Sequence, residues 1–201
     1  MSYRQDSLEI RDAIENWAVW RDSGDWDRFQ TVWGEDGYMT ATWFQGSATE
    51  FIAASRKGFE NGVRILHFLG GTSVDVRADR AIGQTKMTIT QRAQVHDVDV
   101  TCTGRFYDFF ERRDDTWKLV RRQPIYERDR LDVIDPASSV VLTGEVLNAY
   151  PVGYRHLAYV QLAARFEVKK GLPGLTGDAT DRLYAEGRAW LDGAPTPGVP
   201  L

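Results

Sequence analysis

Four long segments rich in strand-forming residues follow one another along the middle of this 201-residue chain, and they limit its fold more than any other feature. They are Arg64–Arg77, Arg80–Val95, Asp99–Arg112 and Thr116–Arg130. The breaks between them contain turn-forming pairs, namely Ala78-Asp79, His96-Asp97 and Asp114-Asp115. Connections this short join neighbouring antiparallel strands, so the sequence predicts a meander of these segments.

The chain before the meander predicts three helices, over Asp6–Arg21, Trp26–Trp33 and Ala48–Lys57. Asp25 is the expected N-cap of the second helix, and Gly34 is expected to end it. Gly37–Phe44 is rich in aromatic and β-branched residues and predicts a strand. Helices and strands segregated in this way indicate an α+β fold, a curved antiparallel sheet with helices on one side.

The last third of the chain has a different pattern. Asp135-Pro136 and Tyr150-Pro151 mark loops, Arg155–Lys169 has helical spacing, and Asp178 or Thr180 is placed to cap a further helix through Leu191. We therefore predict two domains, a sheet-and-helix domain over residues 1–132 and a helical extension over residues 133–201. The extension is expected to act as a lid, as a dimer arm or as a flank packed on the sheet.

Composition excludes several functions. Cys102 is the single cysteine, so internal disulfides and zinc sites built from cysteine pairs are excluded. The net charge of −4 argues against a nucleic-acid or anionic-membrane partner, and no apolar run is long enough to span a bilayer. The charged N-terminus lacks the pattern of a secretion signal, which predicts a cytoplasmic protein. With three histidines and no nucleotide-binding or serine-hydrolase motif, we expect neither a metal nor a cofactor.

Two segments carry a family resemblance. AIENWAVWRDSGDWDRFQTVWGEDGYM (Ala13–Met39) resembles the opening two helices of the SnoaL-like branch of the nuclear transport factor 2-like superfamily, and YDFFERRDDTWKLVRR (Tyr107–Arg122) resembles its closing hairpin. The resemblance extends over about residues 5–130. It implies a cone-shaped sheet, the cystatin-like roll, and a homodimer or homotrimer formed through the open convex face of that sheet. The superfamily contains dehydratases, isomerases, hydrolases, cyclases and non-catalytic binding proteins, so the resemblance alone does not assign a function.

One sub-branch is the most similar: scytalone dehydratase, the bile acid 7α-dehydratase and the hexachlorocyclohexane dehydrochlorinase. That group uses an Asp at the end of the first helix and a His on the strand after the third helix, which correspond to Asp22 and His67 here. An Arg near the end of the last strand lines the dehydrochlorinase pocket and corresponds to Arg122, whereas a basic pocket residue of that enzyme is replaced by Trp17. A second pocket His and the phenol pair of scytalone dehydratase have no clear match.

These residue types suit proton transfer. An imidazole titrates near neutral pH, and a carboxylate on one ring nitrogen orients the ring and stabilises the imidazolium. Arg122 would stabilise developing negative charge. Each residue also has a structural alternative: His67 as a core histidine, Asp22 as a surface cap, and Arg122 in a surface ion pair with Asp108 or Glu111. Strict strand alternation would place Val120 on the same sheet face as Arg122.

Aromatic residues are numerous, with 7 Trp, 8 Tyr and 9 Phe against only 3 His. Six of them lie on elements that line the cone in the resembling family, and we expect them to form an apolar pocket for an aromatic or polycyclic ligand. These expected substrate-binding residues are Trp17, Tyr38, Trp43, Phe68, Tyr107 and Phe109. The alternative for each is a place in the core. His96 is expected in a solvated turn, and His156 would be a lid residue if the extension folds over the cone mouth.

The sequence therefore favours a cofactor-independent lyase, dehydratase-like, in which His67 moves a proton and Asp22 orients it. Its partner would be a small apolar molecule, and the chemistry would be loss of water, of halide or of a carbonyl fragment by a retro-aldol step. Two alternatives stay open. One is an isomerase of the ketosteroid type, which prefers a carboxylate base, and the other is a non-catalytic ligand-binding protein.

Overall fold

The computed structural model describes residues 2–93, 97–135, 137 and 140–196, so His96 lies outside the described residues. Its helices are α1 (Tyr3–Ser23), α2 (Trp26–Thr31), α3 (Ala48–Glu60), α4 (Gly144–Asn148), α5 (Arg155–Ala163) and α6 (Asp178–Leu191). Its strands are β1 (Trp33–Thr40), β2 (Gln45–Ser47), β3 (Ile65–Arg77), β4 (Arg80–Ala93), β5 (Val98–Arg113) and β6 (Thr116–Val133). The predicted α+β fold and the meander are confirmed, and the bounds of β3 to β6 lie close to those expected. The strand predicted over Gly37–Phe44 lies four residues earlier, as β1.

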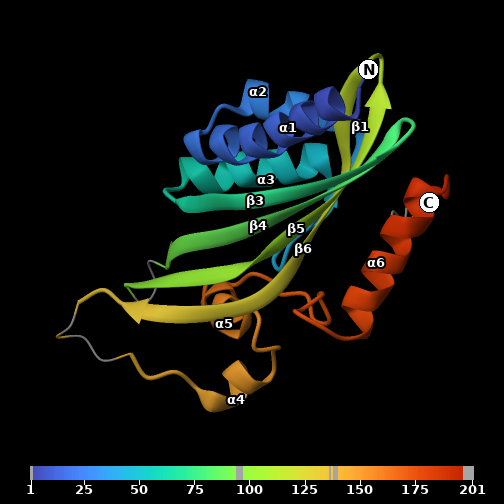
Figure 1. Ribbon diagram of the computed structural model, residues 1–201. Helices are drawn as coiled ribbons and strands as arrows, with labels where there is room; N and C mark the ends of the chain where they lie inside the picture. Colours follow the sequence, from blue (N-terminus) through green and yellow to red (C-terminus); the bar gives the residue numbers. More distant parts are fainter. Residues whose placement is uncertain (1, 94–96, 136, 138–139, 197–201) are drawn as a thin grey trace.

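The strands form one curved sheet in the order β2-β1-β6-β5-β4-β3. Neighbours pair antiparallel, as predicted, except that β1 runs parallel to β6. The turn residues Ala78, Asp97, Asp114 and Asp115 have positive φ, which is the left-handed conformation that tight hairpin turns require. Figure 1 shows α1, α2 and α3 covering one face of the sheet and α6 lying on the other.

The entry into β1 differs from the expectation. Asp25 caps α2 as predicted, accepting a hydrogen bond from the backbone N–H of Arg28. The helix ends at Thr31, however, and Gly34 lies inside the strand that starts at Trp33 instead of ending the helix. The cause is tertiary, because the N–H of Leu119 on β6 donates to the carbonyl of Val32 at 2.9 Å and draws the chain into the sheet.

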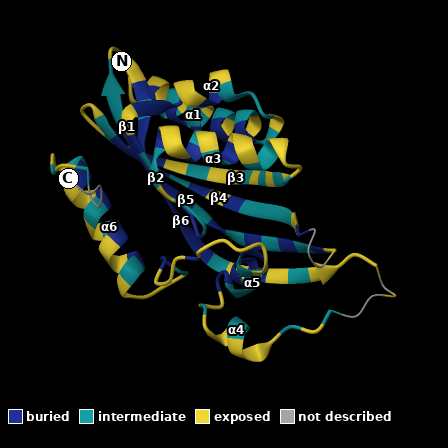
Figure 2. Cartoon of the chain, turned by 180° about the vertical axis from the view of Figure 1, so that it is seen from behind, coloured by how far each residue is buried: buried dark blue, intermediate teal, exposed yellow. Residues whose placement is uncertain are grey.

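Aromatic rings hold the helices on the sheet. Trp17 of α1 lies in the middle, with ring centroids 5.4 Å from Phe29, 6.2 Å from Phe51 and 5.5 Å from Phe106. Edge-on and stacked contacts of this kind, all within one buried cluster, favour the observed packing of α1, α2 and α3 on β5. Figure 2 shows the strands mostly buried or half-buried under the outward, exposed sides of these helices.

The segments after β6 pack directly on the sheet. The carboxylate of Asp129 on β6 accepts hydrogen bonds from the backbone N–H groups of His156 and Leu157 at the start of α5. Backbone hydrogen bonds also join Tyr126 to Pro173 and Lys169 to Thr42. The predicted helix through Leu191 is confirmed as α6, whose buried residues recur at a spacing of three or four. None of the described helices combines the length and the apolar character that crossing a membrane requires.

Candidate active site

Asp22 and His67 form a close pair although 45 positions separate them in the chain. Asp22 lies in the last turn of α1, and His67 lies on β3, which packs against that helix. The Asp22 Oδ1 atom is 2.8 Å from His67 Nδ1, and the backbone N–H of His67 donates to Asp22 Oδ2 at 2.6 Å. Since a carboxylate only accepts hydrogen bonds, Nδ1 carries the proton and Nε2 keeps a lone pair available as a base.

Both groups are held in the protonation states that base catalysis needs. Burial lowers the pKa of His67 below its ordinary value despite the opposing effect of Asp22, and the positive charges of Arg21 and Arg122 lower it further. Burial acts to raise the pKa of the Asp22 carboxyl, but the hydrogen bonds and charge of His67 outweigh it, so the pKa is lowered. The imidazole is therefore neutral and the carboxylate ionised near neutral pH.

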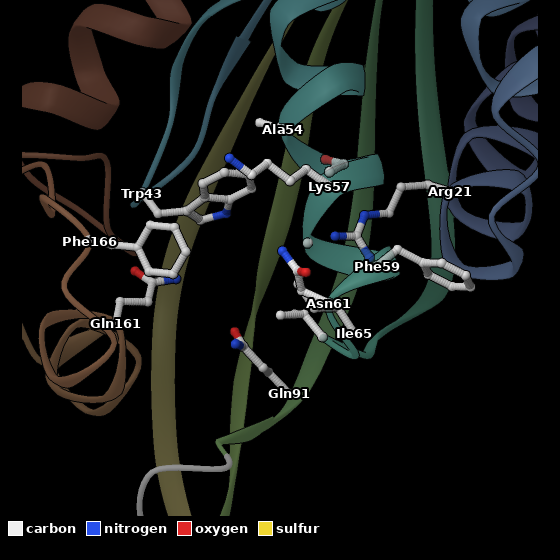
Figure 3. A pocket seen from close by; sticks show the side chains of 13 residues that line it. Arg21, Trp43, Ala54, Lys57, Phe59, Asn61, Ile65, Gln91, Gln161 and Phe166 are labelled. Carbon is white, nitrogen blue, oxygen red and sulfur yellow. The ribbon is translucent and has the colours of Figure 1, made fainter.

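His67 lines the smaller of two adjoining pockets that share five lining residues. We call the larger one, of about 330 Å³, the outer chamber. The smaller one, of about 40 Å³ and lined by His67 and the rings of Trp17 and Phe106, is the inner chamber. The residues that line both chambers are Arg21, Trp43, Ile65, Gln91 and Gln161. Figure 3 shows these side chains around the outer chamber, with α5 on one side and α1 on the other. The walls are mostly apolar, so the cavity suits a small apolar molecule.

The structure places two of the six predicted pocket aromatics, Trp17 and Trp43, on this cavity. It corrects the expectation for the other four. Phe68 is 69% exposed on the opposite sheet face because side chains alternate along β3 and His67 points inward. Tyr107 and Phe109 likewise alternate with Phe106 and pack in a second cluster with α6.

Tyr38 is the fourth aromatic that the structure places elsewhere. It pairs in register with Arg121, whose guanidinium contacts the outward-facing Phe109 and Glu186 of α6. The described residues that line the two chambers include its neighbour Met39 but not Tyr38. The physical reason is again the alternation of side chains along a strand.

Comparison with known proteins places this architecture in a family. The SnoaL-like domain model matches residues 2–123, which is more than half of the chain. The chain belongs to the SnoaL-like domain family. It is also 34% identical over 199 residues to pea pathogenicity protein 2 of Fusarium vanettenii, in an alignment that covers 92% of this chain and 85% of that protein.

Solved structures share the fold. Hexachlorocyclohexane dehydrochlorinase (LinA) type 2 superposes with a TM-score of 0.58 at 14% identity, covering 70% of this chain and 95% of that chain. A scytalone dehydratase-like protein from Novosphingobium aromaticivorans gives 0.56 at 15% identity, covering 69% and 95%. The predicted SnoaL-like family and the cone fold are thereby confirmed. Identities this low concern the fold alone, so the sub-branch stays a prediction.

In this SnoaL-like protein Arg122 lies behind the cavity wall. Its guanidinium is 4.1 Å from the Trp17 ring centroid and 4.0 Å from that of Phe106. It forms two hydrogen bonds of 2.7 Å with Asp108, and both side chains are fully buried. Arg122 therefore forms the ion pair with Asp108 that the sequence offered as its structural alternative, but the pair lies in the core and not on the surface. Burial raises the pKa of the Asp108 carboxyl against the opposing charge of Arg122.

A β-bulge decides which of the two neighbouring arginines faces inward. Phe109 pairs with Arg121 whereas Phe110 pairs with Leu119, so Val120 is the extra residue on β6. Val120 consequently packs in the α6 cluster and not on the face of Arg122, which corrects the expectation from strict alternation.

Arg21 and Gln161 are buried polar residues of the cavity that the sequence did not predict. Arg21 follows Trp17 by one helical turn, so the spacing along α1 was an available signal. Gln161 comes from α5, outside the matched family domain, and nothing local in the sequence points to the cavity. Within the described ranges, three or more His, Cys, Asp or Glu side chains do not gather anywhere in a way that would hold a metal ion.

Proposed function

We propose that this SnoaL-like protein is a cofactor-independent lyase acting on a small apolar, aromatic or polycyclic molecule. The observation that carries the proposal is the Asp22–His67 pair beside a mostly apolar cavity, with the Nδ1 atom held at 2.8 Å from the carboxylate. The name of the superposed dehydrochlorinase is consistent with elimination chemistry on this fold.

His67 Nε2 takes a proton from a substrate carbon, and the electrons of that C–H bond form a double bond as the leaving group departs with its own electron pair. Asp22 fixes the ring and stabilises the imidazolium. The imidazolium then returns its proton to a leaving hydroxide, giving water. Loss of a halide begins with the same proton transfer from carbon. A retro-aldol step begins instead with proton transfer from a hydroxyl to His67. Arg122 acts through its charge, because it does not line the cavity but its positive charge lowers the pKa of His67.

The isomerase alternative requires a carboxylate as the base. Here both oxygens of Asp22 accept hydrogen bonds from His67, and the pKa of the carboxyl is lowered, which makes it a weak base. The geometry therefore favours His67 in that role. A homodimer or homotrimer and a cytoplasmic location stay predictions.

The test is turnover of a panel of aromatic alcohols and halides by the wild type, His67→Ala and Asp22→Asn. We expect kcat/KM to fall by about 10²–10⁴ in both variants, the usual effect of losing a positioned base or its orienting group. His156→Ala is the matched control, because its Nδ1 atom lies at the same 2.8 Å from Asp129 but the residue is not among the described residues lining the chambers. Equal turnover in all four proteins would reject the proposed roles, and saturable binding without turnover in the wild type would favour the non-catalytic alternative.

A further inference from the structure

Two buried polar side chains lie on opposite sides of the cavity and take no part in the proton transfer proposed above. Arg21 projects from α1 and Gln161 from α5, and both line the outer and the inner chamber. Figure 3 shows them on either side of the outer chamber. They are 6% and 5% exposed, so water does not satisfy them freely.

Arg21 has hydrogen-bonding capacity to spare. Among the described residues it forms one ion pair, a 3.3 Å contact from Nη1 to Asp22 Oδ1, an oxygen that already lies 2.8 Å from His67 Nδ1. Its Nε atom is buried and finds no hydrogen-bond partner in the part of the chain that the structure describes. Burial also lowers the pKa of this guanidinium, against the charge of Asp22. A guanidinium has donors only, so the group that completes it must be an acceptor.

Gln161 has the complementary need. Its Oε1 atom is buried and, counting the described residues, lacks a hydrogen-bond donor. The wall beside it is aromatic, with the rings of Trp43 and Phe166 5.6 Å apart. Leaving an amide oxygen unsatisfied among such groups is unfavourable, and an apolar side chain of the same size would avoid the penalty. A ligand with a hydroxyl or N–H group removes it.

We propose that Arg21 and Gln161 form a polar clamp that selects the substrate. The clamp binds a small ring compound with an acceptor oxygen, a carbonyl or phenolate, at the Arg21 end and a hydroxyl or N–H donor at the Gln161 end. Plain hydrocarbons and halocarbons satisfy neither group. Arg21 adjoins Asp22, so the acceptor oxygen lies close to the base and its negative charge is stabilised when the neighbouring carbon loses a proton. The clamp depends on the proposed function in one respect, namely that this cavity is where the substrate binds.

The contribution of α5 gives the extension a role in specificity. The family match ends at residue 123, and Gln161 lies beyond it. The alignment with pea pathogenicity protein 2 covers 92% of this chain and so continues into the extension. The segment that completes the cavity wall is therefore also the segment that recognises one end of the substrate.

The test is a binding matrix with four unreactive probes, measured by titration calorimetry at neutral pH. Para-hydroxyacetophenone carries both groups, acetophenone the carbonyl alone, para-ethylphenol the hydroxyl alone, and ethylbenzene neither. Arg21→Met should raise the Kd of the two ketones by about tenfold and change the Kd of the other two probes by less than about twofold, since hydrogen bonds to charged groups are the stronger ones. Gln161→Leu should raise the Kd of the two phenols by about fivefold and leave the Kd of acetophenone and of ethylbenzene unchanged.

Controls separate the clamp from cavity shape and from folding. Gln91→Leu changes the same residue type in the same cavity at a half-buried position and should weaken the phenols less than Gln161→Leu does. Arg21→Lys keeps a charged donor and Gln161→Glu an acceptor, so each should recover part of the binding lost in Arg21→Met or Gln161→Leu. If each variant weakens the binding of all four probes equally, or of none of them, the clamp is rejected. Because the probes are not turned over, selective losses support the clamp even if the lyase proposal fails, and turnover lost in His67→Ala without selective losses rejects the clamp alone.

Discussion

At the scale of single residues, this protein builds the same Asp–His arrangement twice. In both pairs the carboxylate lies 2.8 Å from the imidazole Nδ1 and accepts the histidine backbone N–H at 2.6 Å. Asp129 with His156 stabilises the start of α5, whereas Asp22 with His67 lies beside a cavity. Local geometry is therefore shared, and the surroundings decide which pair is suited to chemistry.

The depressed pKa of His67 makes a prediction about stability. The unfolded chain binds this proton more tightly than the folded protein, so the histidine costs stability as the pH falls below its ordinary pKa of about 6.5. The Tm of the wild type minus that of His67→Gln should thus be constant at alkaline pH and shrink as the pH is lowered toward about 5.5. Thermal unfolding across this range measures it. A difference that grows on acidification would mean that the folded protein stabilises the imidazolium.

At the scale of elements, α6 covers sheet residues that the family resemblance had suggested for the pocket. Tyr107 and Phe109 pack with Leu183 and Trp190 of this helix. The contact is closest at Gly187, where a Cβ atom would overlap the Tyr107 hydroxyl and lie 2.8 Å from its Cζ atom. The approach of α6 to β5 therefore depends on a glycine at this position.

Gly187→Ala should lower the free energy of unfolding by about 1–3 kcal/mol, because the added methyl group has no space. Tyr107→Phe removes the overlapping oxygen, so the double variant should recover part of the loss. Urea denaturation measures both effects. Gly144→Ala is the control, as a Cβ there meets nothing within 4 Å. Equal stability of Gly187→Ala and Gly144→Ala would contradict this close packing.

At the scale of the whole molecule, the extension is integrated with the sheet that carries His67. β6 contributes Tyr126 to the inner chamber and Asp129 to the start of α5, and α5 contributes Gln161 to the same chamber. The division at residue 132 stays a prediction, and the contacts favour a single cooperative unit over two independent ones.

A substitution where β6 meets α5 should therefore lower the stability of the whole molecule. Asp129→Ala removes hydrogen bonds to two backbone N–H groups and one imidazole, and we expect it to cost about 1–3 kcal/mol. Of the 7 Trp, only Trp190 lies in the extension, so tryptophan emission reports mainly on the sheet-and-helix part, and far-UV circular dichroism on all helices. Both unfolding curves should shift together. Asp132→Ala, at an exposed position of the same strand, should shift neither, and separate midpoints for the two probes would show that the extension unfolds alone.

The sequence by itself determined the elements and the candidate pair of Asp22 and His67. Strand-forming segments between turn pairs predicted β3 to β6 almost to the residue, because those signals are local. Asp22 and His67 were identified through the family resemblance, and the structure brings them into contact. Their roles are the subject of the proposed experiment.

Tertiary structure alone decided which side chains meet in the cavity. A single bulge at Val120 sets the faces of Arg121 and Arg122, and alternation cannot foresee a bulge. The position of Phe68 outside and of Gln161 inside depends on how α1 and α5 pack on the sheet. Such contacts join residues far apart in the chain, and their free energy depends on the packing of the whole molecule, which local pattern does not contain.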